Sequence, residues 1–279
     1  MSLISMTTAP DGTQLASHRW PATAGEAGRP AYLLHGLGEH AGRYDGLARW
    51  LAERGWALAA HDHRGHGRSG GKRGSLAHDD DLVRDAEHRL AEYAQQTGAP
   101  PLLVGHDLGA LVAARIALRG EMPLAGVVLS SPPFALPAAR GRHLLRGALE
   151  RFAPDLRLGT GLRTDALSHD QATIDGYDND PLVHDRITPR LARFIGQAGE
   201  RSIAEAGALK WHTLLLVAGG DTVVDPAGSR RFADGAAPGM LALRWYAQAR
   251  HDIFNETAEF AGPAYADLEA WLATLSARA

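Results

Sequence analysis

Cysteine is absent from the 279-residue chain, so the sequence offers no disulfide and no zinc-thiolate site. The formal net charge of −3 is too small to indicate binding to nucleic acid or to an anionic membrane. No segment approaches the ~20 apolar residues of a membrane span, and residues 1–6 lack the basic start and long apolar core of a signal peptide. We therefore expect a cytoplasmic protein with no nucleic-acid partner and no stable membrane insertion. Nothing in the composition indicates an oligomeric state.

Short apolar segments alternate with helical patterns along most of the chain. A hairpin is expected over residues 3–20, with its turn at Pro10-Asp11-Gly12. Further elements are expected as strands at 31–34, 56–60, 102–105, 126–130, 213–218 and near 241–246, and as helices at about 43–54, 80–96 and 258–275. This alternation predicts a mostly parallel sheet with helices on both faces.

The alternation is interrupted between Ser131 and Trp211. This stretch is far longer than one crossover helix requires, and it contains several helical patterns separated by proline and glycine. We expect a helical lid, residues 132–209, inserted between two strands of a core that comprises residues 1–131 and 210–279.

One part of the predicted lid, the run 136–152, has two interpretations. In a helix, Leu145, Leu149 and Phe152 share one face, and four arginines lie among the other positions. Such a helix can touch a lipid surface with its apolar face. It can also cover a binding site with that face and leave the basic face in solvent, which is the interpretation we favour.

The stretch 105–110, Gly-His-Asp-Leu-Gly-Ala, lies between a predicted buried strand and a run of helix-forming residues. Its spacing is that of the strand-turn-helix pattern G-x-S-x-G, in which a sharp turn exposes the central side chain. The glycines are required because the strand and helix backbones come too close for a Cβ atom. The central residue here is Asp107, so a carboxylate takes the position of the nucleophile.

A nucleophile at this turn needs a base and a residue that orients the base, each just beyond a later strand. Asp221 follows the penultimate predicted strand and His251 follows the last one, so we assign them as acid and base. Asp225 and Asp252 are alternatives for the acid, but only Asp221 directly follows a strand. The predicted catalytic residues are therefore Asp107, Asp221 and His251.

Two backbone N–H groups are expected to form an oxyanion hole beside the turn. One belongs to Leu108, at the start of a helix whose dipole favours negative charge. The other is that of Leu37, which follows His35-Gly36 at the end of the strand 31–34.

Five motifs are spread over nearly the whole chain: HGLGEH at 35–40, RY at 43–44, DHRGHGRS at 62–69, YDNDPLV at 177–183, and GGD at 219–221 followed by His251. Together they resemble monoglyceride lipases and bacterial lysophospholipases. The resemblance implies an α/β-hydrolase fold with a mobile lid over an acyl-chain tunnel and a small apolar or lipid-like substrate. It also implies that Glu39, Arg43 and Tyr177 bind substrate near the polar end of that tunnel.

These lipases have serine where this chain has Asp107, and Gly-His-Asp-x-Gly is similar to epoxide hydrolases and dehalogenases. That match is partial. Dehalogenases usually follow the aspartate with Trp or Arg, here Leu108, and epoxide hydrolases use a pair of lid tyrosines, whereas Tyr177 is the only tyrosine between Tyr93 and Tyr246.

A carboxylate attacks an sp³ carbon without first losing a proton, and His251 can then activate water against the resulting alkyl ester. On a carboxylic ester the same attack would give a high-energy mixed anhydride. We therefore expect a hydrolase that uses Asp107 on an apolar substrate such as an epoxide. The alternatives are a lipase or esterase whose serine has been replaced, and a non-catalytic ligand-binding relative.

Two other interpretations concern structure rather than chemistry. Asp107 suits the N-cap of the following helix, the role expected in a protein without turnover. His61, His63 and His66 lie close together in the sequence, but no carboxylate pair or thiolate accompanies them, so we predict no metal site. We predict no cofactor either.

Overall fold

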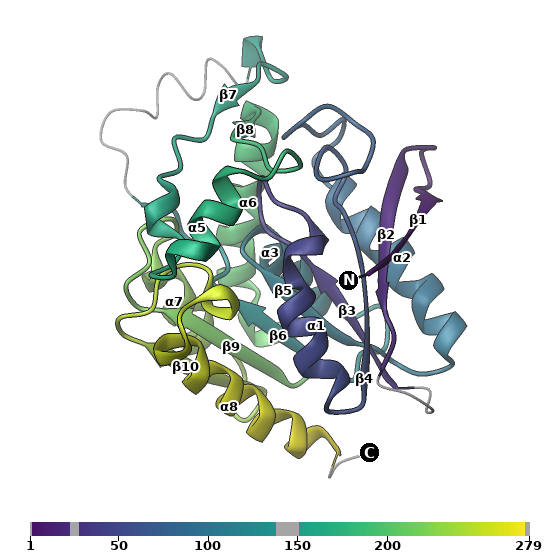
Figure 1. The fold of residues 1–279 in the computed structure, drawn as a ribbon, viewed down its shortest axis with the longest axis vertical. Helices are drawn as coiled ribbons and strands as arrows, with labels where there is room; N and C mark the ends of the chain where they lie inside the picture. The colour runs from purple at the N-terminus through teal and green to yellow at the C-terminus, as the bar shows by residue number, and fades with distance from the viewer. Residues whose placement is uncertain (1, 23–27, 138–150, 277–279) are drawn as a thin grey trace.

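The computed structural model describes residues 2–22, 28–137 and 151–276, and it contains an eight-stranded sheet (Figure 1). In spatial order the strands are β1 (Leu3–Thr8), β2 (Gln14–Trp20), β4 (Trp56–His61), β3 (Arg29–Leu34), β5 (Leu102–His106), β6 (Gly126–Ser130), β9 (Thr213–Ala218) and β10 (Leu241–Tyr246). The pairings β1–β2 and β2–β4 are antiparallel, and all others are parallel. The predicted hairpin and mostly parallel sheet are confirmed.

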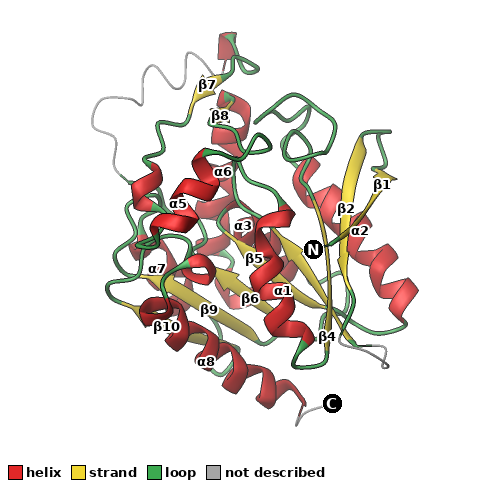
Figure 2. Cartoon of the chain, in the orientation of Figure 1, coloured by secondary structure: helices red, strands yellow, loops and turns green. Residues whose placement is uncertain are grey.

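Helices cover both faces of the sheet (Figure 2). They are α1 (Asp45–Ala52), α2 (Asp81–Thr97), α3 (Leu108–Arg119), α5 (Gln171–Asp178), α6 (Pro189–Ala204), α7 (Pro226–Gly235) and α8 (Ala258–Ser276). The predicted helix at about 43–54 is a 3₁₀ turn, Ala41–Tyr44, followed by α1. Among the described helices, none combines the length and apolar character that crossing a bilayer requires.

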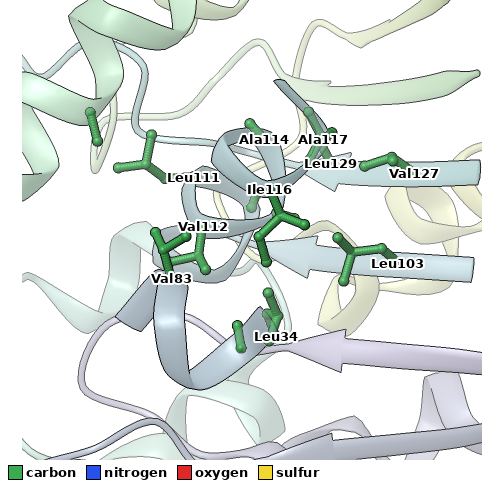
Figure 3. Close-up of a cluster of buried hydrophobic side chains, with 14 of the residues drawn as sticks. Leu34, Val83, Leu103, Leu111, Val112, Ala114, Ile116, Ala117, Val127 and Leu129 are labelled. Atoms are coloured by element: carbon green, nitrogen blue, oxygen red, sulfur yellow. The ribbon is translucent and has the colours of Figure 1, made fainter. Parts of the chain in front are cut away.

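Both faces of the central strands are apolar, which explains why the strand segments read as continuous hydrophobic runs. In β5, Leu103 belongs to the buried cluster under α2, α3, α6 and α7, part of which Figure 3 shows. Its neighbours Leu102 and Val104 belong to the second cluster, under α1 and α8. Successive side chains of a strand alternate between faces, so the sheet forms the middle layer of three.

The turn between β5 and α3 brings strand and helix backbones into contact. A Cβ atom on Gly105 would lie 2.5 Å from the Gly109 carbonyl oxygen, and one on Gly109 would lie 2.0 Å from that of Leu34. Asp107 between them has φ 48° and ψ −120°. Among the described residues only Asp107 and Ser131 combine a side chain with positive φ, a conformation that costs about 1–3 kcal/mol.

The segment between β6 and β9 contains β7 (Leu158–Gly159), β8 (Arg186–Ile187), α5 and α6. Strands β7 and β8 pair with each other near the top of the molecule in Figure 1, and α5 lies below them. Helix α6 instead packs against α3 and α7, with Leu191 and Phe194 in the core cluster. The predicted lid boundaries at 132 and 209 stay a prediction, and most of the run 136–152 lies outside the described residues.

Gly109→Ala is expected to destabilise the fold, because the added Cβ atom would collide with the Leu34 carbonyl group, a backbone atom that cannot rotate away. Overpacking a core position costs about 1–3 kcal/mol, and we expect the upper end of that range or more. Chemical denaturation measures the effect.

Gly46→Ala, in α1, is the matched control, because nothing lies within 4 Å of its added Cβ atom. It should raise the free energy of unfolding by roughly 0.5–1 kcal/mol. A Gly109→Ala protein as stable as the wild type would contradict the close approach of β3 and α3.

Candidate active site

Asp107, Asp221 and His251 lie just beyond the carboxyl ends of β5, β9 and β10, and the parallel sheet brings them together. The Nδ1 atom of His251 lies 2.7 Å from Asp221 Oδ2, and its Nε2 atom lies 3.7 Å from Asp107 Oδ1. The side chains of His251 and Asp221 are almost completely buried, whereas that of Asp107 is 13% exposed. Asp107 is thus the most exposed member of the three.

The geometry distinguishes Asp221 from the two alternative acids. Its Oδ1 atom accepts hydrogen bonds from the amides of Val223 and Val224, which leaves Oδ2 for the imidazole. Asp225 instead caps α7, where it accepts from the Ala227 amide. Asp252 pairs with other side chains, described below.

Mutual attraction between the charged groups determines the protonation of His251. Burial by itself would lower the pKa of His251, but the charge and hydrogen bond of Asp221, and then the charge of Asp107, raise it to about 9. Burial would raise the pKa of Asp221, but the charge and hydrogen bond of His251 lower it instead. At neutral pH His251 is therefore an imidazolium paired with the Asp221 carboxylate.

The Asp107 side chain does not cap α3: it makes no hydrogen bond to the amides of the first helical turn. Its Oδ2 atom instead accepts a hydrogen bond of 2.8 Å from the Leu37 amide, one of the two predicted oxyanion donors. The N-cap interpretation is therefore wrong for the side chain. Leu108, the other predicted donor, begins α3 directly after Asp107, and its donor role stays a prediction.

Glu39 holds the loop that carries Leu37. Its Oε1 atom accepts from the Gly36 amide and from the Tyr44 hydroxyl, each at 2.6 Å, and its Oε2 atom pairs with Arg43. Because Gly36 immediately precedes Leu37, these bonds determine where the Leu37 amide points.

Arg43 links this loop to other parts of the site. Its guanidinium lies 3.1 Å from Asp252 and 4.8 Å from the centre of the Tyr177 ring. The structure therefore brings together Glu39, Arg43 and Tyr177, the three residues expected to bind substrate. The internal bonds of Glu39 and Arg43 indicate that they also fix the loop.

Sequence reasoning missed two contributors to this arrangement. The sequence indicates Asp252 only as an alternative acid, yet it holds Arg43 and accepts from Asn255. The sequence indicates Ser131 only as a boundary, yet its hydroxyl donates to the His251 carbonyl group at 2.8 Å. The signals were an acidic residue directly after the histidine and a hydroxyl directly after β6.

A cavity of about 750 Å³ opens onto Asp107 and His251. Polar residues that line it include the mutually contacting Glu39, Arg43, Tyr177 and Asp252, together with Arg163, Asp165, His184 and Arg250. Apolar side chains line much of the rest, among them Pro133, Leu136, Leu162, Leu167, Ile187, Ile195, Val223 and Val224. A cavity of this size and character suits a small amphiphilic molecule whose polar end meets the charged residues.

Histidines just after β3, at the end of β4 and in the loop that follows β4 pack against one another. The ring centres of His35 and His63 are 4.3 Å apart, and those of His61 and His63 are 5.2 Å apart. Burial lowers the pKa of His63 to about 4, so it is neutral at physiological pH. Within the described ranges, no group of three or more His, Asp or Glu side chains is arranged to hold a metal ion.

Comparison with known proteins identifies the family. Residues 29–258 match the family model described as serine aminopeptidase, S33. The chain belongs to the S33 family. The S33 chain is 32% identical to the monoacylglycerol lipase of Mycolicibacterium smegmatis over 229 residues. The matched region covers 80% of this chain and 81% of that protein.

Human monoglyceride lipase is 31% identical over 278 residues, or 96% of this chain and 90% of that protein. The crystal structure of Paleococcus ferrophilus monoacylglycerol lipase superposes with a TM-score of 0.82 at 33% identity, over 94% of this chain and 99% of that one. This S33 protein is therefore a hydrolase of the α/β-hydrolase type, homologous to monoglyceride lipases. The predicted fold and family are confirmed, and the use of Asp107 as nucleophile stays a proposal.

Asp107→Asn is expected to lower the pKa of His251 from about 9, because it removes one of the charges that raise it. Folding raises the pKa of His251 above its ordinary value of 6.5, so protonation of His251 favours the folded state. This stabilisation is fully present below pH 6.5. That stabilisation, up to about 3 kcal/mol, is lost as the pH rises through 9. The variant should therefore lose less free energy of unfolding than the wild type over this range.

NMR titration of the His251 ring measures the pKa, and denaturation at pH 6 to 10 measures the stability. Asp175→Asn, on the exposed side of α5, is the control and should change neither. An unchanged His251 pKa in Asp107→Asn would show that the two side chains do not interact electrostatically.

Proposed function

We propose that this S33 hydrolase cleaves small apolar or lipid-like substrates through an alkyl ester formed on Asp107. The observation that carries the proposal is the orientation of the Asp107 carboxylate. Its Oδ2 atom is held by the Leu37 amide, its Oδ1 atom lies 3.7 Å from His251 Nε2, and the residue lines the cavity. One oxygen is thus fixed where an oxyanion would form, and the other is free to attack.

In the first step, Oδ1 attacks an sp³ carbon of the substrate, for which an epoxide is the simplest case. The C–O bond of the ring breaks as the ester bond forms, and the alkoxide takes a proton from the His251 imidazolium. Tyr177 can hydrogen-bond to the alkoxide, but burial, and then the charge of Glu39, raise its pKa and make it the weaker acid. Because His251 supplies the proton, this step does not require the second lid tyrosine that the sequence lacks.

The first step prepares the second. Esterification neutralises Asp107, which removes one of the charges that raise the pKa of His251 and favours the neutral imidazole as a base. His251, oriented by Asp221, takes a proton from water as the water attacks the ester carbonyl carbon. The amides of Leu37 and Leu108 stabilise the oxyanion that develops on Oδ2. The alcohol leaves with the proton from His251, which is protonated again when Asp107 ionises.

Hydrolysis of carboxylic esters, such as monoglycerides, is a second candidate. Two observations favour it. The relatives are monoacylglycerol and monoglyceride lipases, and the base His251, the acid Asp221 and the amide donor Leu37 all surround position 107. Against it stands the Asp107 carboxylate, whose negative charge lies where the oxyanion would form. Ester hydrolysis therefore requires an uncharged nucleophile at this position.

Multiple turnovers of a 1,2-epoxyalkane in heavy-oxygen water are expected to introduce heavy oxygen into the Asp107 carboxylate. The label enters because water attacks the carbonyl carbon of the ester, so an oxygen of the side chain leaves with the product. Mass spectrometry of the peptide that contains Asp107 measures it, and Asp107→Asn is the control. Turnover without label would indicate direct attack by water. Absence of turnover on epoxides, alkyl halides and esters, with ligand binding retained, would indicate a non-catalytic relative.

Asp107→Ser is expected to create hydrolysis of short acyl esters and monoglycerides, because serine gives His251 a proton to accept and removes the charge beside the Leu37 amide. One oxyanion donor is worth about 3–4 kcal/mol, so we expect kcat/KM for these esters to rise by roughly 10²–10³. Asp107→Ser combined with His251→Gln is the control and should stay inert. If the serine variant is inactive on esters while the wild type opens epoxides, the site differs from that of its lipase relatives well beyond one residue.

A further inference from the structure

The loop that carries His251 is bound to one wall of the cavity. We call residues 250–257 the histidine loop and residues 165–170 the wall segment, since Asp165, Ala166 and Leu167 line the cavity. The Asp252 amide donates to the Leu167 carbonyl group at 2.8 Å. The Arg250 guanidinium donates to the carbonyl groups of Asp165 and Ser168, also at 2.8 Å. The histidine loop and the wall segment thus form one hydrogen-bonded unit.

Glu256 lies at the centre of this unit and accepts hydrogen bonds from both parts. Within the histidine loop it accepts from the amides of Arg250, at 2.8 Å, and Thr257, at 3.3 Å. From the wall segment it accepts the Ser168 hydroxyl at 3.0 Å and the His169 amide at 2.7 Å, and His169 Nδ1 lies 2.8 Å away. Each of the two carboxylate oxygens therefore has one partner in the histidine loop and at least one in the wall segment.

Glu256 is charged although it is buried. Burial would raise the pKa of its carboxyl group, but the hydrogen bonds from Arg250 and His169, followed by that from Ser168, lower it. A carboxylate can accept several hydrogen bonds in this way, whereas the amide of glutamine has a single acceptor oxygen. The arrangement therefore requires the charged side chain and not merely its shape.

We propose that Glu256 is a positioning residue, which holds the backbone before His251 against the wall segment and so directs the imidazole toward Asp107. The Arg250 amide that it binds belongs to the residue next to His251. Displacement of this amide moves the imidazole relative to Asp107, which approaches it only to 3.7 Å. This role rests on the proposed function of His251.

Glu256→Gln tests the proposal, with Glu259→Gln as the matched control on the exposed first turn of α8. A displacement of about 1 Å can cost roughly a hundredfold in rate, so we expect kcat for the epoxide to fall at least about tenfold with little change in KM. In proton NMR, the downfield signal of the proton between His251 and Asp221 should shift or broaden. The control should preserve both.

Ser168→Ala separates positioning from general stability. It removes the hydroxyl that lies 3.0 Å from both Glu256 and the Asn255 carbonyl group of the histidine loop and that accepts from the Asp170 amide. The amide bonds to Glu256 within the histidine loop stay intact. We expect a smaller change of the same kind in kcat and in the NMR signal.

A lower melting temperature in both variants with wild-type kcat and an unchanged His251 signal would overturn the proposal, because Glu256 would then only stabilise the fold. If the wild type does not turn over any substrate, the proposed function fails, and the NMR signal alone decides the role of Glu256: a changed signal supports it and an unchanged one overturns it.

Discussion

The hydrogen bond from the Leu37 amide to the Asp107 carboxylate is the constraint on which the rest of the site depends. It requires Asp107 to adopt a strained backbone conformation, which the close approach of β5, β3 and α3 at Gly105 and Gly109 enforces. It also requires the loop after β3 to present the Leu37 amide toward the turn, which the hydrogen bond from the Gly36 amide to Glu39 supports. Because one carboxylate oxygen is held in this way, the other is directed toward His251 and the cavity.

Charged side chains at the polar end of the cavity are paired with each other rather than left open to solvent. Arg43 bridges Glu39 and Asp252, and the three side chains are 12%, 4% and 1% exposed. Removing such groups from water costs several kcal/mol each, which only good geometry and further hydrogen bonds can offset. Through the bond from the Gly36 amide to Glu39, the cluster holds the loop that carries the Leu37 amide. Direct contact of Glu39 and Arg43 with substrate stays a prediction.

Much of the fold could be predicted from the sequence because each strand and helix carries a local pattern. The central strands are apolar on both faces, and α2 shows apolar residues at helical spacing, so both element types were recognisable. Strands β7 and β8 have two residues each, too few for any periodicity to be read. Helix α6 lay within the predicted lid because it follows the interruption in the chain, yet it packs against α3. Its position depends on contacts with distant residues, which local periodicity does not report.

The sequence by itself determined which chemical groups the site contains: a carboxylate at the turn after β5, and an acid and a histidine after two later strands. Residue identity and strand order are sufficient for that, because parallel strands end at the same edge of a sheet. Only the tertiary structure decided which partner each group has. Asp107 accepts from an amide 70 residues earlier, and Asp252, an alternative acid in the sequence, pairs with Arg43, 209 residues earlier. Such pairings depend on backbone direction and side-chain rotamers at the sheet edge, which form only when the whole sheet has assembled.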